Sequence, residues 1–214
     1  MISKFISILI FTLFYQFSAL SEIVNVFDFT EEEMKTLKIK KVKGNTDYSI
    51  GSNSNGNYLR AEAAGVGSGL GKEVKINLLK TPFINITWKV EKDLSGIKEK
   101  SKKGHDYAAR VFAIKKTGST ALSNRAINYV FSSNNSVGDH WPSPYTKKSI
   151  DYVLSSTKEH LNEWVTVKAN VRKHFKLLHD LDLEELSGLA IMTDTDNSKL
   201  KTISYYKNIY FSSE

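Results

Sequence analysis

The sequence predicts an all-β protein, an antiparallel β-sandwich of jelly-roll type. Short runs rich in aromatic and β-branched residues alternate polar and apolar side chains with a period of two. Turn-forming stretches separate these runs, for example GSNSNGN at 51–57 and SSNNSVGD at 132–139. Many short strands with little helix in one domain indicate two packed sheets rather than alternating strands and helices.

The stretch FINITWKVE, residues 83–91, shows the strand pattern most clearly. Ile84, Ile86, Trp88 and Val90 fall on one face, and polar residues fall on the other, so one face should be buried and the other wet. The same pattern, less clear in KTLKIKKVKG (35–44), predicts strands at 25–29, 57–63, 72–78, 105–114, 125–133, 150–156, 163–171, 188–193 and 203–212.

Three stretches break this pattern. KLLHDLDLEEL, residues 176–186, has helical spacing and predicts a short helix that caps an end or covers an edge. The glycine-rich GVGSGLG, residues 65–71, predicts a flexible or bulged connection between two strands. The charged stretch from Asp93 to Gly104 predicts a long exposed connection.

Residues 1–21 predict a secretory signal peptide, followed by a single β-sandwich domain at 22–214. Lys4 precedes an apolar run from Phe5 to Phe17, and Ala19 and Ser21 are small residues that suit cleavage after Ser21. The run is shorter than the roughly 20 residues that a membrane span needs, although an uncleaved anchor is the alternative. We expect a periplasmic or secreted monomer without stable membrane insertion after cleavage.

Composition narrows the chemistry further. The chain has no cysteine, which excludes disulfides, thiolate chemistry and lipoprotein attachment, so packing must hold the fold. Its net charge is +7, but the basic clusters KIKKVK (38–43) and KEKSKK (98–103) lack interleaved aromatic residues. These clusters fit solvated edges or loops, and we predict no nucleic-acid partner.

Arg110 is the first candidate site residue. Strand alternation in HDYAARVFAI places Asp106, Arg110 and Phe112 on one face and Tyr107 on the other. An arginine among alanines on a mostly apolar strand needs a carboxylate partner, either Asp106 or one of the aspartates near 195. A ligand site and a purely structural ion pair both fit this pattern. Arg60, which shares a face with Glu62, is a weaker case of the same kind.

IMTDTDNS, residues 191–198, brings Asp194, Asp196 and Asn197 together at a strand end. Asp and Asn are ordinary turn residues, and a ligand or salt-bridge role is the alternative. The glycine and glutamate of a helical calcium loop are missing. We therefore predict no cofactor and no metal, with a calcium site built from distant loops as the remaining possibility.

The three tryptophans are expected to differ in role. Trp88 belongs to the core, and Trp164 should cover the outside of a sheet. Trp141 lies in the Pro-containing stretch GDHWPSPYT beside Tyr145, where it could be a stacking platform for a sugar ring or a lid that packs on the sheet.

Catalytic motifs are scarce. The five histidines have no recognised ligand spacing, and GxSxG, Walker and dinucleotide motifs are missing. Paired carboxylates among Asp106, Asp194, Asp196 and Glu62 remain the one route to an enzyme, as in glycosidases. A carboxylate neutralised by Arg110 would be a poor general acid, because its pKa falls.

The blocks HDYAARVFAI, RAINYVFSS and GLAIMTDTDNS, with YYKNIYF behind them, resemble a family of exported bacterial proteins known as a domain of unknown function. Its members carry DDYAARVYV, ALNYVWSS and AIMTDTDNTG blocks. The resemblance covers about Val24 to Phe211, with differences at positions 105, 131, 198 and 199. It implies a galactose-binding-like or lectin-like sandwich, and the matching positions are Asp106, Tyr107, Arg110, Asn128, Tyr129, Asp194, Asp196 and Asn197.

These observations lead to three hypotheses of function. The first is a non-catalytic protein that binds a carbohydrate or envelope glycan through Arg110, the aspartates, Asn128 and Trp141. The second is a glycan hydrolase or lyase that uses one of the aspartates. The third is a structural envelope protein whose polar cluster only ties the sheets together. We favour the first, and we lean against an enzyme while the second hypothesis stays open.

Overall fold

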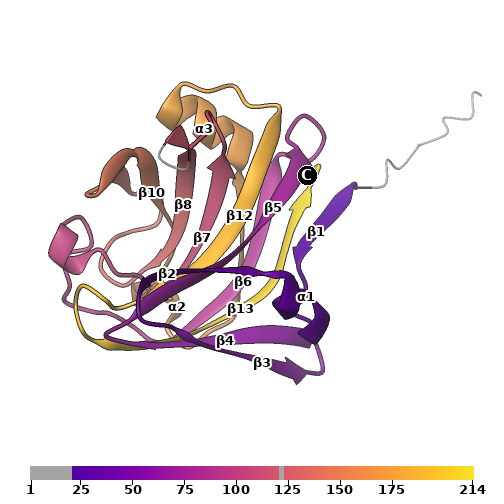
Figure 1. Ribbon diagram of the computed structural model, residues 1–214. Helices are drawn as coiled ribbons and strands as arrows, with labels where there is room; N and C mark the ends of the chain where they lie inside the picture. The colour runs from indigo at the N-terminus through magenta and orange to yellow at the C-terminus, as the bar shows by residue number, and fades with distance from the viewer. Residues whose placement is uncertain (1–20, 121–122) are drawn as a thin grey trace, which may run out of the picture.

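A computed structural model describes residues 21–120 and 123–214 and consists of two packed β-sheets (Figure 1). The six-stranded sheet has the order β11-β6-β13-β4-β3, and β1 pairs with β13 beside this path. Its strands are β1 (Ile23–Phe27), β3 (Asp47–Asn53), β4 (Gly56–Ala64), β6 (Phe83–Lys92), β11 (Val165–Asn170) and β13 (Lys201–Ser212).

The seven-stranded sheet has the order β2-β5-β12-β7-β8-β10-β9. Its strands are β2 (Lys38–Lys43), β5 (Gly67–Asn77), β7 (Ala109–Lys115), β8 (Arg125–Ser132), β9 (His140–Ser143), β10 (Thr146–Ser156) and β12 (Glu185–Asp194). The paired strands are antiparallel except β8 and β10, which run parallel. The predicted all-β sandwich of jelly-roll type is confirmed.

The core lies between the two sheets and follows the predicted alternation. Ile84, Ile86, Trp88 and Val90 of β6 are fully buried, as are Val111 of β7 and Ile191 of β12. The indole N–H of Trp88 donates to Ser155 Oγ at 2.9 Å. The period-two pattern therefore identified the buried face of the central strands, because side chains alternate across a sheet.

Helices are short and lie at the margins. They are α1 (Glu31–Thr36), α2 (Thr157–His160), α3 (Val171–His179) and a single 3-10 turn at Lys102–Gly104. The predicted helix at 176–186 was misplaced: α3 begins after the cap Asn170 and buries Val171 and Phe175, whereas Glu185 already belongs to β12. Among the described residues, no helix has both the length and the apolar character needed to cross a bilayer.

Two further sequence expectations need correction. GVGSGLG is not a connection, because Gly67–Gly71 form the first half of β5 and close contact with β12 requires glycine there. The stretch from Asp93 to Gly104 does connect β6 to β7, but it is only partly exposed, since Leu94 and Glu99 are buried. Glu99 accepts hydrogen bonds from the Ser133 backbone and the Asn135 side chain at 2.8 and 2.7 Å, which ties the connection to the sheet.

The ambiguous stretch near the N-terminus is a strand, β2, as favoured from its sequence. The predicted signal peptide lies outside the described residues except for Ser21. The first described residues lie beside the last ones. Glu22 N–H donates to Ser213 Oγ at 3.2 Å, and Ile23 pairs with Ser212.

Candidate functional site

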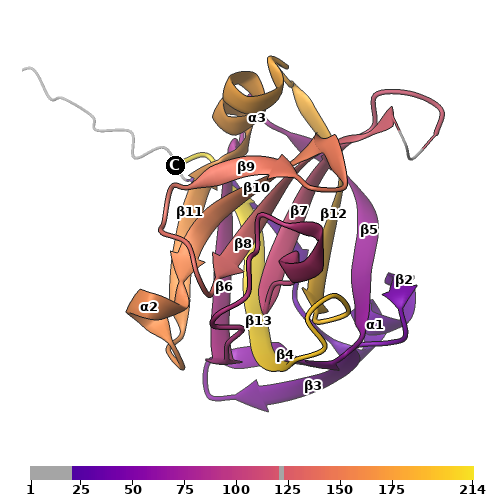
Figure 2. The same cartoon turned by 90° about the vertical axis from the view of Figure 1, so that its left-hand side faces the viewer.

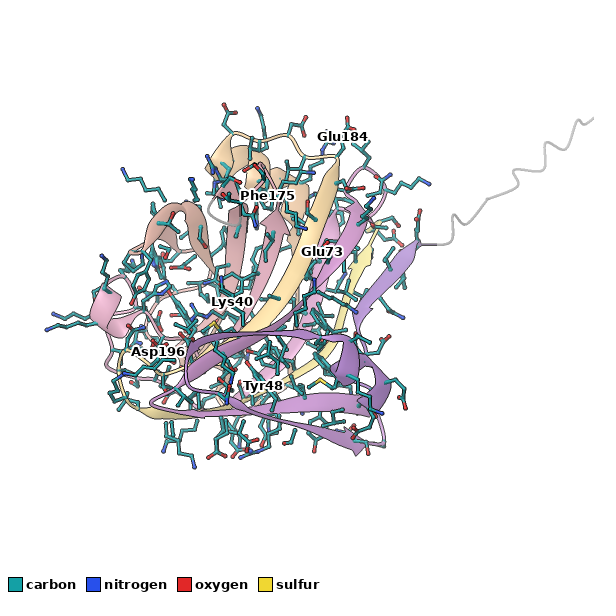
Figure 3. All side chains as sticks on the ribbon, viewed as in Figure 1. Lys40, Tyr48, Glu73, Phe175, Glu184 and Asp196 are labelled. Atoms are coloured by element: carbon teal, nitrogen blue, oxygen red, sulfur yellow. The ribbon has the colours of Figure 1, made fainter. Side chains whose placement is uncertain are left out.

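A groove of about 500 Å³ runs over the outer face of the seven-stranded sheet. Figure 3 labels three of its lining residues, Lys40 on β2, Glu73 on β5 and Asp196 after β12. The floor is made of small or apolar residues from β5, β7 and β12, namely Gly69, Gly71, Phe112, Ile114, Ala190 and Met192. The face is hollow because glycine and alanine add almost no side chain to its centre.

The glycines of β5 allow this strand to lie close to β12. A Cβ atom at Gly67 would lie 2.8 Å from Asp194 Cβ and 2.8 Å from a carboxylate oxygen of Asp196. A Cβ atom at Gly69 would lie 3.0 Å from the Ile191 carbonyl oxygen. The alternation of glycine with Ser68 and Leu70 is a strand signal that the sequence interpretation overlooked, since it leaves one face of β5 without side chains.

Arg110 lines the groove, and its partner is Asp194 rather than Asp106. Arg110 Nη2 donates a hydrogen bond to Asp194 Oδ2. The Tyr107 backbone N–H donates to the same carboxylate at 3.2 Å. Both side chains are buried. Arg110 Nε is also buried but has no hydrogen-bond partner among the described residues.

Burial and charge act in opposite directions on this pair. Burial raises the pKa of Asp194 to about 7, against the lowering effect of the Arg110 guanidinium. The expectation that the pKa of a carboxylate beside Arg110 falls is therefore wrong for Asp194, because its burial outweighs the charge. Burial alone would lower the pKa of Arg110, but Asp194 and Asp151 outweigh it, so that this pKa lies above its ordinary value. Arg110 is therefore a fixed cation in the groove wall.

Asp106 fastens two loops together. Its carboxylate accepts hydrogen bonds from the Asn197 backbone, the Asn197 amide and the Ser198 backbone at 3.1, 2.9 and 2.5 Å. These bonds hold the β6–β7 connection against the loop after β12 (Figure 2). The turn interpretation of IMTDTDNS thus applies to residues 196–198, while Asp194 ends β12 in the ion pair.

Tyr107 packs beside Arg110, and Trp141 packs in a cluster with Tyr107. The expected alternation fails at Tyr107 because β7 starts only at Ala109. The Tyr107 ring instead lies 5.2 Å from the Arg110 guanidinium carbon. Trp141 is 8% exposed and packs with Tyr107, Val130 and Val153, so of its two expected roles the structure favours packing on the sheet over an exposed stacking platform.

A buried hydrogen-bond network around Asp151 was missed from the sequence. His105 Nε2 lies 2.8 Å from Asp151 Oδ2, Asn128 Nδ2 donates to Asp151 Oδ1 at 2.6 Å, and the Tyr107 hydroxyl donates to Asp151 at 3.3 Å. Asn128 Oδ1 is buried without a partner among the described residues. The signal was present in IDYVLSS, where a single carboxylate stands between Ile150 and the largely apolar residues 152–154, and a buried carboxylate needs partners.

Three aspartates approach one another closely enough to be considered as cation ligands. One carboxylate oxygen each from Asp106, Asp194 and Asp196 lies within 4.8 Å of the others. Asp194 already pairs with Arg110, and Asp106 already accepts three N–H groups. The donor set fits a metal poorly, since a cation here would face the guanidinium and share oxygens that are already bonded.

Of the other aromatic and charged residues singled out in the sequence, Trp164 and Arg60 lie outside the groove and Tyr145 lines it. Trp164 sits beside Tyr58 and Tyr205, with ring centroids 6.1 and 6.0 Å away, on the outside of the six-stranded sheet. Arg60 pairs with Glu62 at 2.5 Å on that sheet. Tyr145 lines the groove, and its hydroxyl donates to Asn197 Oδ1 at 2.7 Å.

Comparison with known proteins gives a family and several architectural relatives. The family described as "Protein of unknown function (DUF3047)" matches residues 32–210. No curated protein has significant sequence similarity to the chain.

Three solved structures are similar to the chain over most of its length, at low sequence identity. The family 30 carbohydrate-binding module of the cellulosomal cellulase Cel9D-Cel44B of Clostridium thermocellum has 8% identity and a TM-score of 0.48, covering 90% of this chain and 98% of the module. The family 11 module of Lic26A-Cel5E of the same organism has 12% identity and a TM-score of 0.46, with 91% and 95% covered. The xyloglucanase domain of NopAA from Sinorhizobium fredii has 11% identity and a TM-score of 0.45, with 81% and 92% covered.

Proposed function

The chain belongs to the family of proteins of unknown function (DUF3047), and from its groove we propose that it binds a glycan of the cell envelope or its surroundings. The observation that carries this proposal is a set of three buried polar atoms without partners among the described residues, on side chains that line the groove: Arg110 Nε, Asn124 Oδ1 and Asn128 Oδ1. The first is a donor and the other two are acceptors. A buried polar atom without a partner is costly, so a ligand that satisfies these atoms gains affinity.

A saccharide chain suits this combination of groups. Sugar hydroxyls can both donate and accept hydrogen bonds, so one ligand can bond to the Arg110 N–H and to the Asn128 amide oxygen. The apolar floor around Phe112, Ile114 and Met192 would contact the C–H faces of the rings, and a groove of about 500 Å³ accepts a short segment of such a chain. The signal peptide predicted at 1–21 would deliver the protein to the periplasm or the medium, where these glycans occur.

The glycosidase alternative has less support because most acids of the cluster are already engaged. Asp194 is paired with Arg110, and Asp106 accepts three N–H groups of the loop after β12. A hydrolase needs one carboxylic acid and one carboxylate facing each other across the sugar.

Affinity electrophoresis or calorimetry of residues 22–214 with a panel of soluble polysaccharides tests the proposal. Tyr145→Ala and Trp164→Ala form a matched pair of exposed aromatic variants, one at the groove and one on the opposite sheet. We expect Tyr145→Ala to weaken binding about tenfold, which corresponds to about 1.4 kcal/mol, and Trp164→Ala to leave it unchanged. Binding that is lost only in Trp164→Ala would move the site to the six-stranded sheet, and no binding to any glycan would reject the proposed function.

A further inference from the structure

His105 and Asp151 form a histidine–carboxylate pair in the wall of the groove. The Nε2 and Oδ2 atoms are 2.8 Å apart, and both side chains are buried, His105 at 8% and Asp151 at 0% exposure. The imidazole is enclosed by Tyr107 and Tyr145, with ring centroids 5.3 and 5.5 Å away at steep angles. Within the described part of the chain the second ring nitrogen, Nδ1, has no hydrogen-bond partner, and His105 is one of the residues that line the groove.

This arrangement is that of a positioned base. A carboxylate that accepts from Nε2–H fixes the tautomer in which Nδ1 carries the lone pair, and it stabilises the imidazolium that forms when Nδ1 takes a proton. Asp151 is itself held by Asn128 and Tyr107, so the ring orientation is rigid. A histidine required only for packing would not need its second nitrogen left free beside a groove.

The groups around His105 that still lack partners favour an acidic sugar. Arg110 Nε is an unpaired donor on a fixed cation, and Lys40 on β2 lines the groove without a carboxylate partner among the described residues. Lys38 and Lys116 also line the groove, although both pair with Glu73 at 3.7 and 3.0 Å. A uronate carboxylate would pair with the Lys40 ammonium and accept from Arg110 Nε, whereas a neutral sugar would leave Lys40 without a counter-charge.

Building on glycan binding, we propose that the groove takes a uronate-containing polysaccharide and that His105 cleaves it by β-elimination. His105 Nδ1 removes the proton from the ring carbon next to the carboxylate, and the electron pair of that C–H bond forms a carbon–carbon double bond to the neighbouring ring carbon. The bond from that neighbouring carbon to the glycosidic oxygen breaks, and the leaving oxygen takes a proton from water. Arg110 stabilises the negative charge that spreads onto the carboxylate, and Asp151 is a positioning residue.

The test is an ultraviolet assay for the conjugated double bond, with polygalacturonate, alginate and a glucuronate polymer as substrates and the purified chain as enzyme. We expect the wild-type protein to form the unsaturated product from one of these polymers and not from a neutral glucan. His105→Gln should lower kcat by about 100-fold or more while binding of the polymer persists. His160→Gln is the matched control. His160 is half-exposed, pairs with Glu163 and is not among the residues that line the groove.

Two further measurements keep the result interpretable if His105→Gln folds poorly. Added imidazole should restore part of the activity of His105→Ala, since the small base can occupy the vacated space. Asp151→Asn should lower kcat and leave KM for the polymer almost unchanged, because Asp151 orients the His105 ring and does not line the groove. Neither effect is expected from a residue that only packs.

The outcomes separate this inference from the proposed function. Binding of uronate polymers without an unsaturated product overturns the elimination and leaves glycan binding standing. New reducing ends without a double bond would indicate hydrolysis and also overturn it. Equal binding of neutral and acidic polymers rejects the acidic specificity, and failure to bind any glycan rejects both the function and the inference.

Discussion

Arg110 and Asp194 place two opposite charges where almost no water reaches them. Their side chains are 5% and 1% exposed, so each depends on the other for its neutralisation. Breaking a buried pair costs much more than replacing it, because the remaining charge stays desolvated. The pair is therefore both a constraint on the fold and the reason why Arg110 stays charged beside the groove.

A double-mutant cycle tests this dependence. We expect Asp194→Ala to lower the free energy of unfolding by about 3–5 kcal/mol, since it leaves a buried guanidinium alone. The combination Arg110→Met with Asp194→Ala should recover a large part of that loss. Urea unfolding of the four proteins measures the coupling. A single-variant cost below about 1 kcal/mol would mean that water reaches the guanidinium, as in an exposed pair.

His174 on α3 provides a pH-dependent term. Its Nδ1 lies 3.1 Å from the Tyr129 hydroxyl, and its ring stacks on Tyr152 at 4.3 Å. Burial, assisted by Lys173 and His140, lowers its pKa from 6.5 to about 4. The folded state therefore favours the neutral ring, and the stability that depends on it is complete above pH 6.5 and lost as the pH falls toward 4.

Thermal unfolding between pH 7 and about pH 4 isolates this contribution. We expect the melting temperature of the wild-type protein to fall more steeply with acid than that of His174→Gln, which has no group to protonate. His160→Gln should follow the wild-type curve. Parallel curves for all three proteins would show that His174 titrates equally in the folded and unfolded chains.

At the scale of single residues, the sequence predicted the ion pair of Arg110 but not the pair of His105 with Asp151. An arginine among alanines and an aspartate cluster at a strand end were enough to expect an ion pair, because a buried cation requires a carboxylate. His105 and Asp151 could not be joined in this way, because a neutral histidine does not require a carboxylate partner and only the placement of β10 beside β8 brings them together. Asp106 looked equivalent to Asp194, but the irregular backbone before Ala109 turns its side chain toward Asn197.

Among the elements, β5 depends most directly on the size of its side chains. Gly67 faces Asp194 and Asp196, and a methyl group there would have to displace atoms 2.8 Å away. Gly188, on β12, would bring a methyl group no closer than 3.3 Å to a carbonyl oxygen of Lys72. The two positions belong to neighbouring strands of the same floor but differ in available space.

We expect Gly67→Ala to destabilise the protein by about 1–3 kcal/mol, the usual cost of overpacking, and to weaken glycan binding by disturbing Asp194. Gly188→Ala should have a clearly smaller effect on both. Denaturant unfolding and the binding assay measure the two consequences. A milder effect at Gly67 than at Gly188 would show that β5 can move away from β12 without loss.

Element prediction succeeded where the apolar alternation was strong and failed where another constraint decided the backbone. β6 and β8 were located because their buried faces carry large apolar side chains at every second position. The start of β5 was missed because glycine usually marks a turn, whereas close strand contact is its role here. The helix was placed too late along the chain because Val171 also fits the preceding strand and the cap at Asn170 was overlooked.

For the whole molecule, the layered fold followed from the sequence, but the order of strands did not. Two pairings depend on contacts between distant segments: β8 with β10, which is parallel, and β1 with the last strand. The local alternation of polar and apolar residues does not determine such long-range pairings. The same reason explains why a groove was not predicted: its lining residues come from all seven strands of one sheet and from loops between them.

Export of the chain is the expectation that concerns the molecule as a whole. β1 starts at Ile23 and pairs with β13 through Ile23–Ser212, and Val26 and Phe27 are buried. Cleavage after Ser21 would therefore remove the predicted signal peptide and keep every residue of β1. A cut even five residues later would remove part of a strand from the core, which costs several kcal/mol for one large side chain.

We expect protein recovered from the periplasm or medium of a bacterial host to begin at Glu22, as read by N-terminal sequencing or intact mass. A variant with arginine in the apolar run, Leu9→Arg, should stay in the cytoplasm with its full mass, because a charge there disrupts the export signal. Its folded domain should still melt like the wild-type protein after proteolytic removal of the leader. A full-length chain retained with the membrane pellet would instead identify residues 5–17 as an anchor that tethers the groove to the membrane.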